Sequence, residues 1–266
     1  MSEANLSHRR KHVEHNFSKS AHRYHEHAWL QQICADRLMA ILQQEHMDIV
    51  PGDVLEIGCG TGFITKQLFQ HFAERHLCVT DLSPIMLKTC QESLQQLYPD
   101  INASYEILDG ERFNSRKQYA IIIAGLVFQW FAELEKSING LVKGLVPGGR
   151  LLFSILTAQS FPEWRQCCQE LGLPYTGNRF PEISELNRQN ESSAYKKTVR
   201  QEVVKVRHPS AGHFFKHFKL IGANTGLSQH SLKPYEMKRL IQYWDAQCPE
   251  GVTITYDVVY SMYTTY

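Results

Sequence analysis

Short apolar runs alternate with amphipathic stretches over the first 156 residues of the chain. The runs predict strands at residues 53–57, 76–80, 104–108, 119–124 and 150–155. The amphipathic stretches predict helices at residues 28–45, 61–73 and 133–145, and another that begins at Ser83-Pro84, a capping residue followed by a first-turn proline. This alternation is typical of a mostly parallel α/β sheet with helices on both faces.

The pattern changes after residue 156. We expect helices at residues 161–171, 182–190, 213–221 and 234–247, and strands at residues 198–206 and 252–263. No repeat or low-complexity linker divides the chain, so we expect a single domain over residues 1–266. Its predicted parts are an N-terminal helical cap (1–49), a cofactor-binding core (50–156), an inserted substrate-side segment (157–194) and a C-terminal part that completes the sheet (195–266).

The first strand leads into a glycine loop, in which Glu56 is followed by Gly58, Gly60 and Gly62 and then by a helix. Glycine lacks a β-carbon, so the backbone can turn sharply after the strand and approach a ligand closely. The free N–H groups of the next helix's first turn can then face that ligand. An acid just before such a loop suits a cofactor with a positively charged amino-acid end, and S-adenosylmethionine is the first candidate.

Two other interpretations of the glycine loop stay open at this point. A dinucleotide fingerprint, Gly-x-Gly-x-x-Gly, requires glycine at position 63, where this chain has Phe63. A tight structural turn without a ligand would also use these glycines.

Acids at the ends of the next two strands favour an adenosyl ligand. Ligands of such sheets bind beyond the carboxyl ends of the strands, where the chain order reverses. Asp81 lies 19 residues after Gly62, a spacing at which a carboxylate can accept both ribose hydroxyls. Leu82 and Met86 are placed to pack on the adenine ring. Asp109, followed by Gly110, is placed to accept the adenine amino group.

Composition sets the broad class of the protein. Hydrophobic residues make up 43% and charged residues 21%, as in ordinary globular proteins. No apolar run reaches the roughly 18 residues that span a bilayer, and the N-terminus lacks a signal-peptide core. We therefore expect a cytoplasmic protein that does not bind membranes. The seven cysteines follow no pattern and predict reduced thiols. Histidines crowd residues 8–27 at irregular spacing, which favours a solvated helix over a metal site, so no metal is expected.

Charge is unevenly distributed although the net charge is only +1. Residues 186–240 hold 11 Lys and Arg against 3 acids, a local charge of 11 − 3 = +8. Such a segment indicates either a docking surface for an acidic partner or a solvated basic face. Nucleic acid is not the expected partner, because Gly125-Leu-Val-Phe128 stands after the fourth strand in place of an Asn-Pro-Pro-Tyr-like motif.

These motifs resemble the class I S-adenosylmethionine-dependent methyltransferases over roughly residues 50–156. The resemblance depends on segments 56–62, 81–84 and 145–150 and on Asp109. It implies a seven-stranded Rossmann-like sheet in the order 3-2-1-4-5-7-6, with strand seven antiparallel and a helical insertion between strands five and six. The fourth strand opens with Tyr119-Ala120 where the family usually has an aromatic residue and an acid. Since that acid is mostly structural, cofactor binding is still expected.

Segments outside the core narrow the resemblance. Residues 17–28, 126–130, 178–180 and 220–224 are similar to the malonyl-acyl-carrier-protein O-methyltransferases of biotin synthesis, the BioC type. The resemblance implies an enzyme that esterifies the free carboxyl of a malonyl thioester. It also implies an acyl carrier protein as partner, for which the basic segment from Lys196 to Lys219 is the expected docking surface.

The same resemblance suggests roles for four acceptor-side residues. Tyr24 would close over the cofactor, Gln129 and Trp130 would line the pocket, and Arg179 would hold the carboxylate through paired N–H bonds. A carboxylate is ionised at neutral pH, so no general base is required. Other functions remain open: a methyltransferase of another small acid such as aconitate or of a quinone-like metabolite, and a catalytically silent cofactor-binding partner protein.

Overall fold

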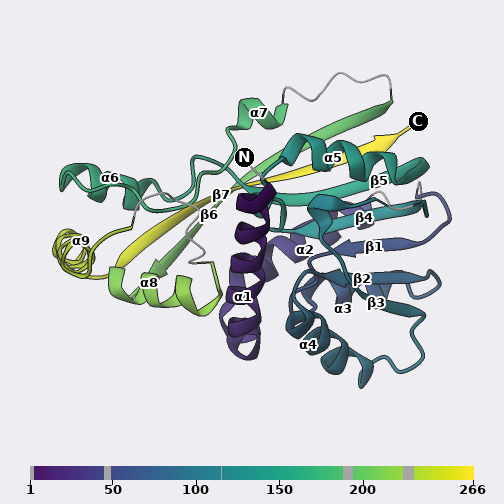
Figure 1. The fold of residues 1–266 in the computed structure, drawn as a ribbon, viewed down its shortest axis with the longest axis horizontal. Helices are drawn as coiled ribbons and strands as arrows, with labels where there is room; N and C mark the ends of the chain where they lie inside the picture. The colour runs from purple at the N-terminus through teal and green to yellow at the C-terminus, as the bar shows by residue number, and fades with distance from the viewer. Residues whose placement is uncertain (1–2, 45–48, 115, 188–193, 224–230) are drawn as a thin grey trace.

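Seven strands form one sheet in the order β3-β2-β1-β4-β5-β7-β6 (Figure 1). The computed structural model describes residues 3–44, 49–114, 116–187, 194–223 and 231–266. The strands are β1 (Val54–Ile57), β2 (Leu77–Asp81), β3 (Ala103–Ile107), β4 (Tyr119–Gly125), β5 (Leu145–Leu156), β6 (Tyr195–His208) and β7 (Val252–Thr265). The first five run parallel, and β7 is antiparallel to both β5 and β6. The predicted order and direction of the strands are therefore confirmed.

Helices cover both faces of this sheet. They are α1 (Glu3–His27), α2 (Trp29–Gln44), α3 (Phe63–His71), α4 (Pro84–Gln95), α5 (Leu134–Lys143), α6 (Pro162–Glu170), α7 (Ile183–Asn187), α8 (Ala211–Leu220) and α9 (Pro234–Gln247). Two 3₁₀ turns, η2 (Gly110–Arg112) and η3 (Phe128–Trp130), follow β3 and β4. The expected helical insertion consists of α6 and α7, between β5 and β6. Among the described helices, none is long and apolar enough to cross a membrane.

The all-apolar strand β4 is buried on both faces, as its composition predicts. Ile121 and Ile123 join one hydrophobic cluster with α2, while Ile122 joins a second cluster with Ile138 of α5. Successive side chains of a strand point to opposite faces, so one short strand supplies both cores. This burial places the carboxyl end of β4 at a defined position in the middle of the sheet.

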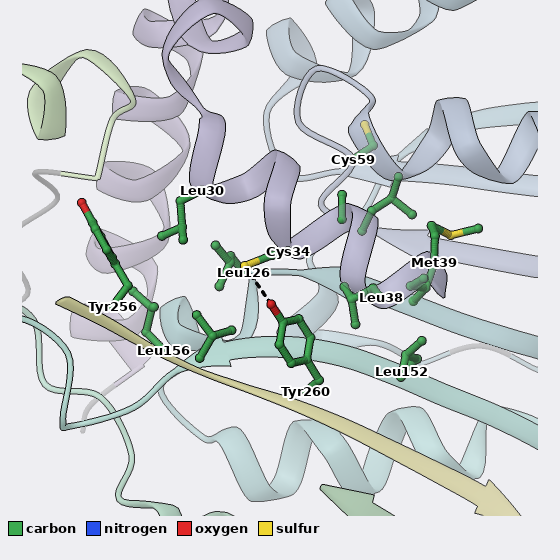
Figure 2. Close-up of a cluster of buried hydrophobic side chains, with 14 of the residues drawn as sticks. Leu30, Cys34, Leu38, Met39, Cys59, Leu126, Leu152, Leu156, Tyr256 and Tyr260 are labelled. Carbon is green, nitrogen blue, oxygen red and sulfur yellow. Dashed lines mark hydrogen bonds between the residues drawn. The ribbon is translucent and has the colours of Figure 1, made fainter. Parts of the chain in front are cut away.

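Helix α2 is packed tightly onto the first of these cores. Figure 2 shows Cys34, Leu38 and Met39 of α2 against side chains of β5 and β7. The Tyr260 hydroxyl of β7 lies 3.7 Å from Cys34 Sγ of α2 and 3.2 Å from Glu202 Oε2. Burial raises the pKa of Tyr260, so this hydroxyl stays protonated. The first turn of α2, which reaches the functional site, is therefore held by a rigid support.

Most predicted boundaries agree with the structure within a few residues. One strand boundary and the expected burial of one helix differ from the prediction. Strand β5 begins at Leu145 rather than at residue 150, because the Thr265 hydroxyl donates to the Val146 carbonyl and keeps that segment in the sheet. The helix over residues 8–27 is not solvated on all sides: Val13 and Tyr24 are buried. Residue 45, residues 188–190 and residue 224, which belong to predicted elements or motifs, lie outside the described residues.

A buried histidine cluster joins β6 to α8. His208 and His217 are 3% and 8% exposed, and the Trp29 indole N–H donates to His217 Nε2 over 3.1 Å. Burial, with a smaller effect of His217 and His213, lowers the pKa of His208 from 6.5 to about 4. Burial lowers the pKa of His217 as well. Both imidazoles are therefore neutral in the folded protein at neutral pH.

This cluster predicts a stability that depends on acid. Between pH 6.5 and about 4 the unfolded chain binds a proton at His208 that the folded chain does not, so the free energy of unfolding falls as the pH is lowered through that window. His208→Gln removes this difference, and we expect it to lose less stability than wild type between pH 7 and pH 4.5 in denaturant titrations. His22→Gln, at an exposed histidine of α1, serves as the control. Equal acid sensitivity in both variants would contradict the prediction.

Candidate active site

A cavity lies beyond the carboxyl ends of β1, β2 and β4, where a sheet of this order places its ligands. Most of the predicted site residues line it: Tyr24, Gly58, Gly60, Asp81, Leu82, Met86, Asp109, Gly110, Gln129 and Trp130. Within the described part of the chain, Glu56, Gly62 and Arg179 are not among the lining residues. The structure thus brings the cofactor-side and acceptor-side predictions together in one place, with three exceptions.

The glycine loop has the backbone conformation that its sequence predicts. Gly58, Gly60 and Gly62 have φ angles of 70°, 55° and 96°, in the region that favours glycine. A methyl group added to Gly58 would lie 2.4 Å from Cγ2 of Val127, so the loop packs directly against the segment after β4. Gly62 caps the start of α3 and is buried against Cys90 of α4, which explains why it does not face the cavity.

Asp81 holds two loops in place at the end of β2. One carboxylate oxygen accepts the Gly60 N–H over 2.9 Å, and the other accepts the Ser83 N–H over 2.8 Å. The residue is 9% exposed, and burial raises its pKa to about 6 against the opposing effect of these N–H groups. Each carboxylate oxygen has a second lone pair, so Asp81 can still accept ligand hydroxyls.

Glu56 is fully buried beneath the glycine loop rather than in the cavity wall. It is 1% exposed and accepts a hydrogen bond from the Thr65 hydroxyl of α3 over 2.7 Å. Burial raises its pKa to about 8, so the carboxyl is mostly protonated at neutral pH. A cation brought nearby would favour its ionised form. Its role in binding the cofactor stays a prediction.

Arg10 of α1 also lines the cavity. Its guanidinium lies 3.4 Å from Asp109 and 4.0 Å from Glu111. Arg10 was not predictable from the sequence, because one arginine in a polar N-terminal helix carries no local signal of tertiary contact. The ion pairs attach α1 to the loop that follows β3.

Aromatic contacts attach the rest of α1 to the same cavity. The Phe17 ring is 6.1 Å from Tyr24 and 5.4 Å from Trp130, both in edge-on geometry. Figure 1 shows α1 crossing the front of the sheet between α4 and α8, and it contacts both helices. Burial raises the pKa of Tyr24, so its hydroxyl stays a hydrogen-bond donor at neutral pH rather than a base.

Arg179 does not reach the cavity. Its side chain is exposed, while its neighbours Asn178 and Phe180 both line the cavity wall. The residues on either side of Arg179 thus turn inward and leave its own side chain facing solvent. The expected grip of Arg179 on a carboxylate has no support from this placement.

Comparisons with known proteins identify the family. A family model described as a methyltransferase domain matches residues 55–151. A malonyl-[acyl-carrier protein] O-methyltransferase of Magnetococcus marinus is 31% identical over 250 residues, which cover 94% of this chain and 90% of that protein. The chain belongs to this family. A relative of the same name from Halalkalibacterium halodurans is 28% identical over 93% of this chain and 96% of its own length.

Solved structures show the same fold at low sequence identity. The YcgJ protein of Bacillus subtilis has a TM-score of 0.61 and 12% identity, covering 86% of this chain and 98% of its own. The magnesium protoporphyrin IX methyltransferase of Synechocystis PCC 6803, solved with bound S-adenosylhomocysteine, has a TM-score of 0.55 and 14% identity, covering 88% and 83%. These likenesses support the class I methyltransferase fold.

As a member of this methyltransferase family, the chain uses S-adenosylmethionine, and the cavity fits that cofactor. Gly60 faces the cavity with only Tyr24 near an added methyl group, at 3.6 Å, so the backbone can approach a ligand closely. The Asp81 carboxylate would accept the ribose hydroxyls, and Leu82 and Met86 would pack on the adenine. Bound there, the cofactor supplies an activated methyl group on a sulfonium.

The close contact at Gly58 makes a testable prediction. In Gly58→Ala the methyl group would displace Val127 and strain the loop, so we expect at least about a tenfold loss of affinity for S-adenosylhomocysteine in calorimetry. Gly172→Ala is a matched control, since Gly172 has a similar φ of 65° and nothing within 4 Å of an added methyl group. If both variants bind the cofactor product like wild type, the loop does not form the cofactor site.

The raised pKa of Asp81 predicts acid-sensitive cofactor binding. Above pH 6 the carboxylate is ionised and can accept ribose hydroxyls; below pH 6 protonation competes with binding, at up to about tenfold per pH unit. We expect affinity for S-adenosylhomocysteine to fall between pH 7 and pH 5 in wild type and in the exposed-site control Asp100→Asn. Asp81→Asn should bind weakly at both pH values, with a smaller change between them. An unaltered pH dependence in Asp81→Asn would show that another group controls binding.

Proposed function

We propose that this protein transfers the methyl group of S-adenosylmethionine to the free carboxylate of a malonyl thioester carried by acyl carrier protein, as a step of biotin biosynthesis. The observation that carries the proposal is the match to the Magnetococcus marinus protein of that name over 94% of this chain. The match extends beyond the cofactor core to α1 and the insertion, which contribute to the cavity wall. A 28% identical relative named a biotin biosynthesis bifunctional protein, BioCD, from Bordetella avium supports the pathway.

The cavity suits this reaction chemically. A lone pair of the carboxylate oxygen forms the new bond to the methyl carbon while the carbon–sulfur bond breaks and its electron pair stays on sulfur. No proton moves, because the carboxylate is already ionised at neutral pH. The chain therefore has to align the two reactants and exclude water. Leu30, Phe161 and Phe218 supply an apolar wall for that purpose.

The basic segment does not form a single surface along β6. Lys196 and Arg200 are on the face of the sheet covered by α2, where Arg200 donates to Gln44. Lys205 and Arg207, at odd positions of the same strand, are on the opposite face. Lys197 turns inward to the Leu186 carbonyl, and burial lowers its pKa to about 8. A carrier protein that contacts one face of the sheet would meet only part of this charge.

Helix α8 is the part of the basic segment that borders the cavity. Phe218 and Ile221 line the cavity, while Lys216 and Lys219 are exposed on the outer side of the same helix. No ion pair is formed by either lysine within the described residues. We therefore propose that the acidic carrier protein docks on the outer face of α8, because Phe218 of the same helix lines the cavity.

One assay tests the proposed reaction. The protein is incubated with labelled S-adenosylmethionine and, in parallel, malonyl-acyl-carrier protein, malonyl-CoA, aconitate or RNA. We expect a methyl ester on the malonyl thioesters and none on the other acceptors. No ester on either malonyl thioester would contradict the proposal, and growth of a biotin-requiring bacterial strain that carries the gene would support it independently.

Charge reversal tests the docking surface. Lys216→Glu combined with Lys219→Glu should raise the KM for malonyl-acyl-carrier protein by about tenfold or more and leave the KM for malonyl-CoA unchanged, because only the carrier presents an acidic surface. Lys66→Glu with Lys143→Glu, an exposed pair on α3 and α5, controls for net charge. An equal effect of both pairs would mean that overall charge, rather than α8, attracts the carrier.

A further inference from the structure

We infer that the side-chain amides of Gln31 and Gln129, and no cationic side chain, hold the carboxylate that accepts the methyl group. Gln31 is in the first turn of α2, and Gln129 is in η3 after β4. Both line the same cavity. The inference rests on the proposed function, since it names the groups that recognise the malonyl end of the substrate.

The amide oxygens of both glutamines are buried. The Oε1 atoms of Gln31 and Gln129 are shielded from solvent and have no hydrogen-bond partner among the described residues. Buried amide groups are nearly always hydrogen-bonded, because an unpaired one costs free energy. The surrounding wall is apolar, with Leu30 beside Gln31 in the sequence and Leu126 on the same loop as Gln129. A polar ligand in this cavity would therefore find its hydrogen-bonding groups at these two amides.

A glutamine amide can present either end to a ligand. Its NH₂ group has two donors, its oxygen has two lone pairs, and rotation about the last bond exchanges them. With the NH₂ groups turned inward, two such side chains offer donors to a carboxylate. The same groups can accept or donate to the neighbouring thioester carbonyl and amide of the carrier arm.

The described lining of the cavity offers no unpaired cation to a carboxylate. Arg10 is the one lysine or arginine among the described lining residues, and it is paired with Asp109 and Glu111. Arg179 is exposed outside the lining. The malonyl carboxylate would thus meet neutral donors and the positive sulfonium of the cofactor.

This arrangement has a catalytic reason. The reaction joins a negative carboxylate to a positive sulfonium, so both charges disappear in the transition state. An arginine bound to the carboxylate would stabilise the charged ground state more than the transition state and would slow the reaction. Neutral amides orient the carboxylate with a smaller loss of interaction as its charge moves into the new carbon–oxygen bond.

The test compares two ligands that differ only in the charge of the acyl end. Binding of malonyl-CoA and of its methyl ester is measured by calorimetry with S-adenosylhomocysteine present, and methyl transfer is measured separately. In Gln31→Glu we expect malonyl-CoA binding to weaken by at least about tenfold more than binding of the methyl ester, because only the first brings a like charge to the new carboxylate. Gln31→Leu should weaken both ligands and lower the rate of methyl transfer. Gln32→Glu, at an exposed glutamine next in sequence, should behave as wild type.

Each contrary result has a distinct meaning. If Gln31→Glu binds malonyl-CoA and its methyl ester in the same ratio as wild type, Gln31 does not face the carboxylate and the inference is wrong. If the variant loses S-adenosylhomocysteine as strongly as malonyl-CoA, Gln31 has a structural role and the inference is also wrong. If wild type forms no ester on a malonyl thioester, the proposed function itself fails, whatever the variants do.

Discussion

The carboxylate of Asp81 is hydrogen-bonded to the backbone of two loops at once, and the cavity wall depends on it. Through Gly60 it holds the loop after β1, and through Ser83 it holds the start of α4. The Ser83 hydroxyl in turn caps α4 at the Met86 N–H and lies 2.7 Å from the Ser18 hydroxyl of α1. One buried acid thus links the glycine loop, the start of α4 and the helix α1 that covers the cavity. Burial away from water raises the pKa of this carboxyl.

The described lining of the cavity holds one cationic side chain, and acids neutralise it. Arg10 is paired with Asp109 and Glu111 after β3. Gln31, Gln129 and Tyr24 line the same cavity, and burial raises the pKa of Tyr24 and keeps its hydroxyl protonated. Such a lining suits a reaction in which a cofactor cation and an acceptor anion neutralise each other, since an unpaired fixed charge near the reacting atoms would favour the separated state over the transition state.

Sequence reasoning succeeded where local pattern determines local structure. Alternation of apolar runs predicted the strands, and the resemblance carried by the glycine loop and the strand-end acids predicted their order in the sheet. The left-handed backbone of Gly58 and the place of Asp81 at a strand end were predictable because each depends on local sequence, and their roles in binding the cofactor stay predictions. Arg179 shows the limit: whether a side chain in an irregular segment points inward depends on packing that its neighbours in sequence do not reveal. Gln31 was missed for the same reason, since its partner elements are distant in the chain.

The basic segment shows a second limit. A count of charges over residues 186–240 treats the segment as one surface, but the residues of β6 alternate between the two faces of the sheet and α8 presents its lysines elsewhere. Charge density in sequence therefore predicted that an acidic partner could dock and did not predict where. The docking surface that we propose therefore uses only the lysines of α8, the helix that borders the cavity.

A structure of the protein with S-adenosylhomocysteine and malonyl-CoA would test the central claim most directly, because it shows which groups surround the methyl-accepting carboxylate. We predict that the oxygens of this carboxylate lie within hydrogen-bond distance of the Gln31 and Gln129 amides and that no lysine or arginine is within ion-pair distance of them. A carboxylate paired with Arg179 or another cation would contradict it.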